Sequence, residues 1–294
     1  MEVPMSRLGQ TSLEPLEPYD GKLSSTVLRG ESPRKGADLL DIPPNGGKLQ
    51  PIICIEKNEK KMKKNRRNKK QLVKRATGFI TGGFRPTNSN TESWIGQVYL
   101  YRESEDIPID SNGKAMLPLL QICLEGLPYI PDALKGSKVL TIFVSENMPG
   151  RLAYNGDAWV IREYKEEDVL VVKDIYMQSS SRIKPYPLKS QLITEDYPVW
   201  DSGDIPMDIE DELVEMEDSG EITDYYDYTD CFAGHKIGGY PNYIQSGIDF
   251  GDGYEFMIQI ASDEKANLNI IDSGNFYLAK NSQTGDWRLY CDFY

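Results

Sequence analysis

The sequence predicts an α+β domain that is predominantly β and internally duplicated: two pseudo-repeats share one core, and an acidic helical insert separates them. A Gly-Gly-aromatic turn occurs at 82–84 and again at 238–240. An apolar segment with a single glutamine follows each turn, as Leu-Leu-Gln-Ile at 119–122 and Met-Ile-Gln-Ile at 257–260. The same features in the same order indicate two related units. Segments rich in β-branched and aromatic residues, bounded by turn residues, indicate that most elements are strands.

The first 75 residues differ in composition from the rest of the chain. Residues 1–50 are rich in Pro, Gly, Ser and Leu without a sustained apolar period, which predicts a loosely ordered arm. Residues 51–75 are expected to form a short strand at 51–55 and then a basic segment. Lys57–Arg75 contains eleven Lys or Arg residues and one Glu, with too few apolar residues for a buried face.

Three interpretations of this basic segment stay open. In the first, the segment is an exposed helix or tether. In the second, it is an arm that contacts RNA or DNA phosphates. In the third, it is an electrostatic clasp that binds either an acidic partner or the acidic insert of this chain. The side chains that would contact RNA are Lys63, Lys64, Arg66, Arg67, Lys69 and Lys70.

The duplicated domain is expected to span 76–294. Its first copy covers 76–190, its second copy covers 232–294, and the acidic insert covers 191–231. Turn residues and apolar runs place the strands. The expected strands are 94–101, 116–123, 139–144, 159–164, 169–176, 254–260, 272–278 and 287–294.

The acidic insert is predicted to contain a helix. Residues 195–230 include fifteen Asp or Glu and no Lys or Arg. Apolar residues at helical spacing between 208 and 217 predict an amphipathic helix that lies on the β core. With a net charge of −13 for 294 residues, the chain combines an acidic body with one basic segment, a pattern that favours charged contacts with partners.

The chain has few residues that could perform catalysis or bind a metal. It has four cysteines, no C-x-x-C pair and one histidine, which nearly excludes a Cys/His zinc site. A Ser-His-Asp arrangement would have to use His235, whose other interpretation is a hydrogen bond that stabilises the adjacent turn. No phosphate loop or calcium loop is present. The sequence predicts no catalytic residues, no metal and no cofactor, and therefore no enzyme.

Gln121 and Gln259 each lie in an apolar strand, where an unpaired amide costs about 1–3 kcal/mol. We expect them to hold the backbone of a neighbouring loop, with a polar contact in a ligand groove as the alternative. The motif residues that could form such a groove are Gly82, Gly83, Trp94, Gln121, His235, Gly238, Gly239, Tyr240, Pro241, Gln245 and Gln259.

The second copy resembles the bacterial YwqG-like family, a domain of unknown function thought to be distantly related to the programmed cell death protein 2 domain. The resemblance lies in His235–Gln245, in Gln259-Ile260, in Asp272–Tyr277 and in the Trp287–Tyr294 ending. It covers roughly 76–294. It implies a mostly β, duplicated, protein-binding domain, as in immunity proteins or chaperone-like partners, and it assigns no catalytic residues.

From this resemblance and the charge pattern we expect a non-enzymatic protein-binding domain of immunity or chaperone-like type. Its acidic face would engage a basic protein, such as a toxin or a ribosome-related protein. The alternative is an RNA-associated factor, of the type that assists ribosomal RNA processing, which uses the basic segment within 57–75. No secretory signal or membrane-spanning segment is recognisable, so we expect a cytoplasmic protein without membrane contacts.

Overall fold

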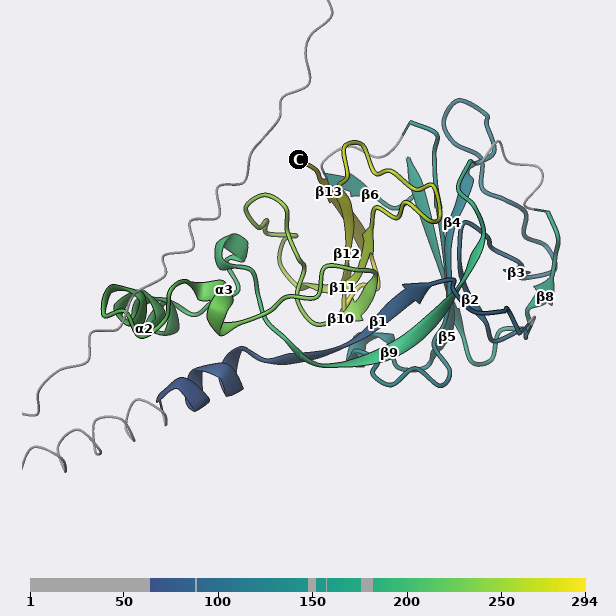
Figure 1. Cartoon of the computed structure of the whole chain (residues 1–294). Coiled ribbons are helices and arrows are strands. Elements are labelled where there is room, and N and C mark those ends of the chain that lie inside the picture. Colours follow the sequence, from purple (N-terminus) through teal and green to yellow (C-terminus); the bar gives the residue numbers. More distant parts are fainter. Residues whose placement is uncertain (1–63, 88, 148–151, 157, 176–181) are drawn as a thin grey trace, which may run out of the picture. The chain divides into compact units, whose positions relative to one another are not determined.

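The computed structural model describes residues 64–87, 89–147, 152–156, 158–175 and 182–294 (Figure 1). The predictions for residues 1–50, for a strand at 51–55 and for Lys63 fall outside these residues. In the part of the chain that the structure describes, no helix is both long enough and apolar enough to cross a membrane.

Eleven antiparallel strands form one sheet, in the spatial order β6-β13-β12-β11-β10-β1-β9-β2-β4-β5-β7. β3 (Leu100–Tyr101) and β8 (Val171–Val172) form a separate pair. The strands of the large sheet are β1 (Lys74–Thr81), β2 (Ser93–Ile95), β4 (Leu117–Cys123), β5 (Ser137–Val144), β6 (Leu152–Tyr154), β7 (Trp159–Lys165), β9 (Tyr186–Asp196), β10 (Lys236–Gly238), β11 (Tyr254–Ala261), β12 (Asn275–Asn281) and β13 (Trp287–Asp292).

The sheet curves until its two edges approach each other, which makes it a nearly closed, barrel-like sheet. β6 and β7 are consecutive in sequence but lie on opposite edges. Glu163 on β7 bridges these edges: it accepts hydrogen bonds from Lys280 Nζ on β12 at 2.8 Å and from Trp287 Nε1 on β13 at 3.3 Å. Burial raises the pKa of Glu163, but hydrogen bonds from Lys165, Lys280 and Ser137 outweigh it and lower the pKa to about 2.

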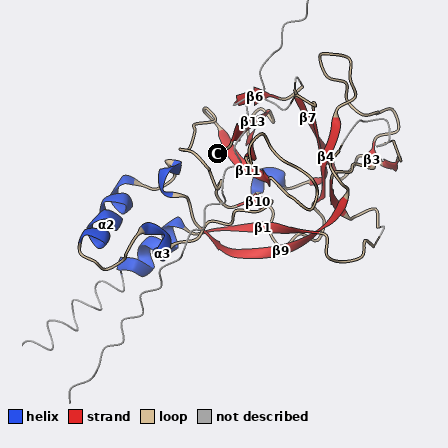
Figure 2. Cartoon of the chain, turned by 45° about the horizontal axis from the view of Figure 1, so that its top comes forward, coloured by secondary structure: helices blue, strands red, loops and turns tan. Residues whose placement is uncertain are grey.

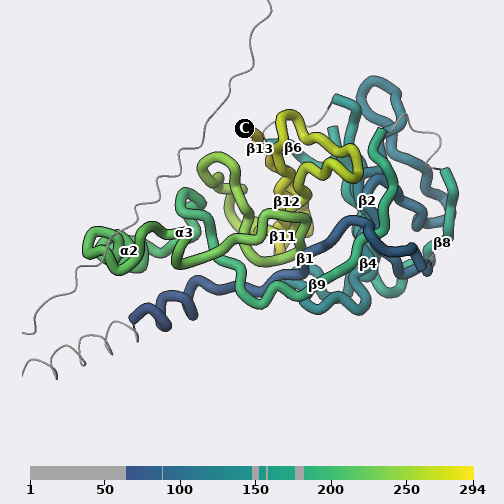
Figure 3. The backbone as a smooth tube through the Cα atoms, in the orientation of Figure 1, coloured from purple at the N-terminus to yellow at the C-terminus, as the bar shows by residue number. Residues whose placement is uncertain are grey.

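The main core lies inside this curved sheet, where the strands contribute alternate apolar side chains. Its fully buried members include Ile95, Leu120, Ile142, Trp159, Ile258 and Phe276, each from a different strand. β1 and β9 run side by side through the middle of the sheet (Figure 3) and join its two halves.

The prediction of an α+β fold made of two copies with a helical insert between them is wrong. The fold is mostly β, and the strands assigned to the two copies belong to one continuous sheet, in which no duplication is shown. β1, from the first predicted copy, lies between β9 and β10, and β6 pairs with β13 of the second. The expected boundary at 190/191 falls inside β9. Short local similarities in turns and strands did not identify which strands pair, because pairing depends on residues far apart in the sequence.

The helices are short and gather beyond one end of β1 and β9 (Figure 2). This group contains α2 (Met207–Asp218), α3 (Tyr225–Tyr228), the helix at residues 64–72 and the 3₁₀ turn η3 (Trp200–Ser202). The 3₁₀ turn η1 (Asp132–Leu134) lies apart from them, with Leu134 in the main core and the Ala133 carbonyl bonded to Lys280 of β12. The predicted helix at 208–217 is therefore confirmed as α2. It does not lie on the β core, however. Its buried residues Ile209, Leu213 and Met216 pack with Leu72, Tyr225 and Tyr228 in a separate apolar cluster.

The basic helix 64–72 packs against α2 and the loop that follows it. Lys64 Nζ lies 3.6 Å from Glu212 Oε1, and Asn68 Nδ2 donates to Glu212 Oε2 at 2.7 Å. Tyr228 donates to the Asn65 carbonyl at 2.6 Å, and its ring lies 4.5 Å below the Lys69 ammonium group. Of the three interpretations of the basic segment, these contacts match a clasp on the acidic insert of the same chain.

Candidate functional site

The turn after β10 is built on a buried ion pair. Asp196, the last residue of β9, accepts hydrogen bonds from Lys236 Nζ at 2.9 Å, from the Tyr240 N–H at 2.8 Å and from the Phe232 N–H at 2.7 Å. Asp196 and Lys236 are both completely buried. A buried charge is tolerated when it is paired and hydrogen-bonded, and this carboxylate is satisfied by three separate donors.

Gly239 is required by the same carboxylate. Its φ is +72°, in the left-handed region, and a Cβ atom there would lie 2.0 Å from Asp196 Oδ2. Only glycine lets the backbone approach the carboxylate this closely. The Gly-Gly pair predicted from the sequence is thus explained by Asp196 and Lys236, to which sequence reasoning assigned no role. β10 consists of Lys236, Ile237 and Gly238, and the sequence around it carries no signal that pairs Lys236 with Asp196.

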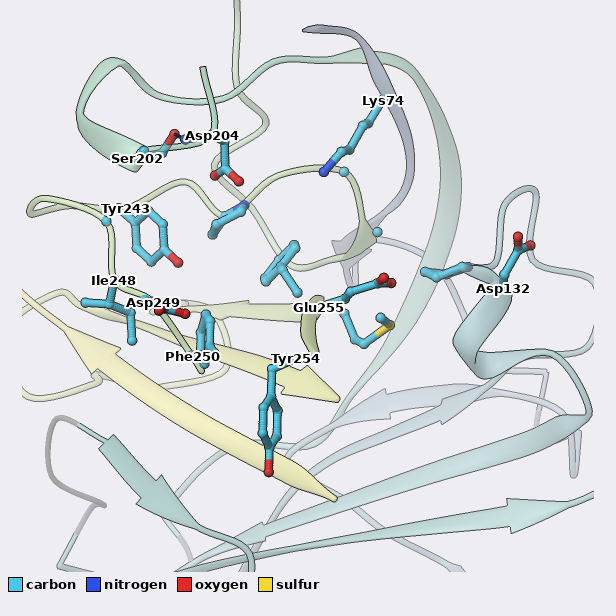
Figure 4. Close-up of a pocket in the computed structure, with 18 of the residues that line it drawn as sticks. Lys74, Asp132, Ser202, Asp204, Tyr243, Ile248, Asp249, Phe250, Tyr254 and Glu255 are labelled. Carbon is cyan, nitrogen blue, oxygen red and sulfur yellow. Dashed lines mark hydrogen bonds between the residues drawn. The ribbon is translucent and has the colours of Figure 1, made fainter. Parts of the chain in front are cut away.

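A cavity of about 800 Å³ lies beside this turn (Figure 4). The start of β11 forms one wall, and the loops at 202–204 and 247–250 form others. The turn contributes Gly238, Gly239 and Pro241. Of the predicted groove residues, these three are the ones that the structure places in the cavity lining.

Acidic side chains dominate the charge of the cavity. Asp132, Asp204, Asp249 and Glu255 line it together with one cation, Lys74. Asp132 pairs with Lys135 at 2.6 Å, and Asp249 accepts a hydrogen bond from the Gly251 N–H at 2.7 Å. Figure 4 shows Lys74, Asp204 and Glu255 directed toward the same space.

Burial shifts the two charged groups at the top of the cavity in opposite directions. It raises the pKa of Asp204, which Lys74 partly offsets. It lowers the pKa of Lys74, against the attraction of Asp204, Glu255 and Asp196. The Lys74 ammonium group lies 3.8 Å from the centroid of the Tyr240 ring, a cation–π contact. Tyr240 therefore holds the single cation at the edge of the cavity.

Aromatic side chains form the apolar part of the lining. Tyr243 and Phe250 are buried, and Tyr243 packs on Tyr277 with ring centroids 4.8 Å apart. The Arg288 guanidinium group lies 4.2 Å from the Tyr254 ring and donates to the Phe250 carbonyl. These contacts hold the rings of Tyr243 and Tyr254 and the backbone of Phe250 in place.

His235 and Gln259 stabilise the strands and loops behind the cavity and do not line it. His235 accepts a hydrogen bond at Nδ1 from the Ala261 N–H at 3.1 Å, so Nε2 carries the proton that it shares with Asp263 at 3.2 Å. Gln259 accepts from the Asn242 N–H at 2.7 Å and donates to the carbonyls of Ala233 and Gly234. Gln259 thus holds the backbone of neighbouring loops, as expected, whereas the hydrogen bonds of His235 go to β11 and Asp263 and not to the adjacent turn.

Gln245 and Asp292 join the loop after the turn to the last strand. The Gln245 side chain donates to the Phe293 carbonyl at 2.7 Å. Asp292 Oδ2 accepts from the Ile244 and Gln245 N–H groups at 2.9 and 3.2 Å. Gln245 therefore positions this loop and is not among the residues that line the cavity.

The motif residues of the first half lie elsewhere. Gln121 accepts from the N–H groups of Tyr99 and Leu100, both at 3.0 Å, and so holds a loop. Trp94 lines a separate cavity of about 340 Å³ with Tyr99. Gly82 and Gly83 form a turn that lines neither cavity. The predicted motif residues therefore do not assemble into one groove.

The predicted RNA-contact residues divide into two groups. Lys64 and Lys69 contact the acidic insert, as described above. Arg66, Arg67 and Lys70 are exposed on helix 64–72.

The described cysteines, Cys123, Cys231 and Cys291, are free thiols. Burial raises the pKa of Cys123 and Cys291 to about 12 and that of Cys231 to about 11, which makes them poor nucleophiles. Among the described residues, no group of three His, Cys, Asp or Glu side chains is arranged to hold a metal ion.

Fold and cavity together define a mostly β domain with an acidic, aromatic-lined cavity beside a Gly-Gly turn. The family model described as Domain of unknown function (DUF1963) matches residues 95–283, which is more than half of the chain. The chain belongs to this family. The expectation of a domain of unknown function is thereby confirmed. A search of the curated proteins found no match.

Proposed function

We propose that this domain is a non-enzymatic protein-binding domain whose cavity receives a basic segment of a partner protein. One observation carries the proposal: a cavity of about 800 Å³ brings carboxylates together with fixed aromatic rings. Arg and Lys side chains match both features. Their alkyl stems pack on aromatic surface, and their charged ends pair with carboxylates or lie over rings.

The electrostatic balance of the lining favours a cationic ligand. Four carboxylates and one ammonium group line the cavity. Asp204, whose pKa is raised, is a carboxylate that its surroundings fail to stabilise fully. A ligand cation beside it supplies the missing stabilisation of the charged form.

The chain itself provides an example of this kind of recognition. Its own basic helix, 64–72, binds the acidic helix α2 through Lys64, Asn68 and Glu212. Because this contact occupies part of α2, we assign the partner to the cavity rather than to α2. We further propose a YwqG-like domain of immunity or chaperone-like type that works in the cytoplasm. The sequence motif at 235–245 supports that narrower family assignment.

The test is the binding of a synthetic peptide in which Lys or Arg alternates with Val, measured by isothermal titration calorimetry on the full chain. We expect binding that weakens as salt rises and that falls by about tenfold in Asp204→Asn or Glu255→Gln. The matched control is Asp211→Asn, which removes an identical charge from an exposed position on α2. Equal affinity in Asp204→Asn and Asp211→Asn would contradict the cavity as the site.

A second candidate, an RNA-associated factor, is favoured by one observation. Arg66, Arg67 and Lys70 are exposed on helix 64–72, and their spacing of three and four residues places them on one face. If RNA is the partner, Arg66→Ala combined with Arg67→Ala will reduce binding of a single-stranded RNA in a gel-shift assay. Under the leading proposal, the same double variant leaves binding of the basic peptide unchanged.

A further inference from the structure

The register of the sheet leaves part of β11 beyond the end of its neighbour. β10 pairs with β11 at only two positions, Lys236 with Gln259 and Ile237 with Ile258. β11 begins four residues before Ile258, at Tyr254. Residues 254–257 therefore extend past the last paired position, and all four line the cavity.

This part of β11 is paired on one edge only. On the far edge, Tyr254, Glu255 and Phe256 pair with Asn281, Lys280 and Ala279 of β12. On the cavity edge, within the described residues, no strand pairs with 254–257. The Tyr254 N–H is used in a local turn, where it donates to the Gly251 carbonyl at 3.1 Å. The register of β11 with β12 shifts between Phe256 and Ile258. Alternate residues of a strand direct their backbone groups to the same edge, so part of the backbone of 255–257 is directed to the cavity edge, where a strand would otherwise continue.

The reason that β10 stops is the turn described above. Gly238 and Gly239 have φ of +75° and +72°, which no continuing strand adopts. The Tyr240 N–H is directed to Asp196. The ring of Tyr240 then lies under Lys74 of β1. In the space between β1 and β11 beyond the end of β10, the side next to β1 is therefore filled by the chain itself. The edge of β11 is what stays open.

We propose that the partner segment binds as an extended strand that continues the line of β10 and pairs with residues 255–257 of β11. This mode rests on the proposed function, since it takes the basic partner segment as given. An open strand edge is a template for another extended chain, and main-chain hydrogen bonds then supply affinity while side-chain pockets supply specificity.

The side chains around the edge suit such a strand. Successive residues of an extended segment point to opposite faces, so every second side chain reaches the same surroundings. Asp204 and Glu255 would receive Lys or Arg side chains on one face, and Tyr243 and Phe250 would receive the intervening apolar ones. A ligand that binds as a helix would leave the edge of β11 unpaired and would present basic residues at a spacing of three or four.

The experiment is a backbone N-methyl scan of the alternating Lys/Arg–Val peptide, with affinity for the full chain measured at each position. An N-methyl group removes one main-chain donor and blocks pairing on that edge. In a strand, only alternate residues direct their N–H toward a given neighbour. We therefore expect methylation to weaken binding by about tenfold or more at every second position near the centre, and to leave the positions between them within about twofold.

The outcomes separate this inference from the proposed function. An alternating loss supports strand addition. Uniform tolerance or uniform loss along the peptide overturns strand addition, while binding of the unmodified peptide that depends on Asp204 leaves the proposed function standing. If the unmodified peptide binds no better than a control peptide with Glu in place of Lys and Arg, the proposed function fails and the inference fails with it. Amide hydrogen exchange gives a second readout, because pairing must slow exchange within 255–257.

Discussion

The two Gly-Gly turns of this molecule have nearly the same sequence and different surroundings. In the first turn, a Cβ atom on Gly83 would meet nothing closer than Lys265 Nζ at 3.8 Å. In the second, a Cβ atom on Gly239 would overlap the buried Asp196 carboxylate. The first turn lines no large cavity, whereas the second lines the cavity of about 800 Å³. A local motif therefore specifies a turn, and a buried partner from a distant strand converts one such turn into part of a candidate site.

The carboxylates near the two turns also differ, in how far the fold stabilises their charged form. Beside the first, burial raises the pKa of Asp263, but hydrogen bonds from His235, Thr81 and the Ala266 N–H outweigh it and hold that pKa well below its ordinary value of 3.8. Beside the second, burial raises the pKa of Asp204 above the same value. The first carboxylate is stabilised by the fold. The second is stabilised only in part, by Lys74 and Ser202, and the proposed basic ligand would complete its stabilisation.

The largest expected effect comes from removing the buried partner of the second turn. Asp196→Ala leaves the Lys236 ammonium group buried without a counter-ion and frees the Tyr240 and Phe232 N–H groups. We expect the free energy of unfolding to fall by about 3–5 kcal/mol, measured by urea denaturation. The control at the first turn is Lys265→Ala, which removes only a 2.7 Å hydrogen bond to the Thr81 carbonyl. We expect Lys265→Ala to lower the free energy of unfolding by about 1 kcal/mol. Equal losses in Asp196→Ala and Lys265→Ala would contradict the claim that a buried partner distinguishes the second turn from the first.

A smaller effect is expected from the glycines themselves. Gly83→Ala meets only the cost of a left-handed backbone, about 1–2 kcal/mol. Gly239→Ala meets that cost and also displaces the Asp196 carboxylate, so we expect a loss of about 3 kcal/mol. Urea denaturation of both variants checks the difference. If Gly239→Ala costs no more than Gly83→Ala, the carboxylate does not constrain the second turn.

The smallest effect concerns pH at the first turn. The folded pKa of Asp263 is depressed, so its contribution to stability is present above 3.8 and is lost as the pH falls through the folded pKa. We expect Asp263→Asn to cost about 2 kcal/mol at pH 7 and less below pH 3.8. Urea denaturation at several pH values measures this. A cost that stays constant down to pH 2 would show that the charge of Asp263 contributes nothing.

Strands that bury an apolar face were predictable from the sequence. The expected strands at 116–123, 139–144, 159–164 and 254–260 agree with β4, β5, β7 and β11 to within two residues. The helix at 208–217 was equally clear. Apolar periodicity is a local signal, and these elements carry it strongly.

The strands that hold the sheet together were missed. β1 and β9 lie at its centre, yet β9 contains many polar residues, such as Lys189, Ser190 and Gln191, and half of it was assigned to the acidic insert. Its exposed face gives it a mixed pattern that resembles a loop. The candidate site was predicted only in part, because the local sequence does not show which distant residues meet. Gly238, Gly239 and Pro241 were recognisable as a motif, whereas Lys74, Asp204 and Glu255 join them only through tertiary structure.

The position of β1 has a consequence for how the protein is made. β1 is synthesised long before its two neighbours: Ala76 pairs with Ile193 on one side and Gly238 on the other. Both backbone edges of β1 lack their partners until the ribosome has passed Asp196, and the edge that pairs with β10 lacks its partner until Gly238 has been added, so the emerging chain is exposed to wrong pairing. A fragment cut to the family match at 95–283 lacks both β1 and β13. Folding of this domain therefore waits for nearly the whole chain, and expression of the family region alone should yield aggregates.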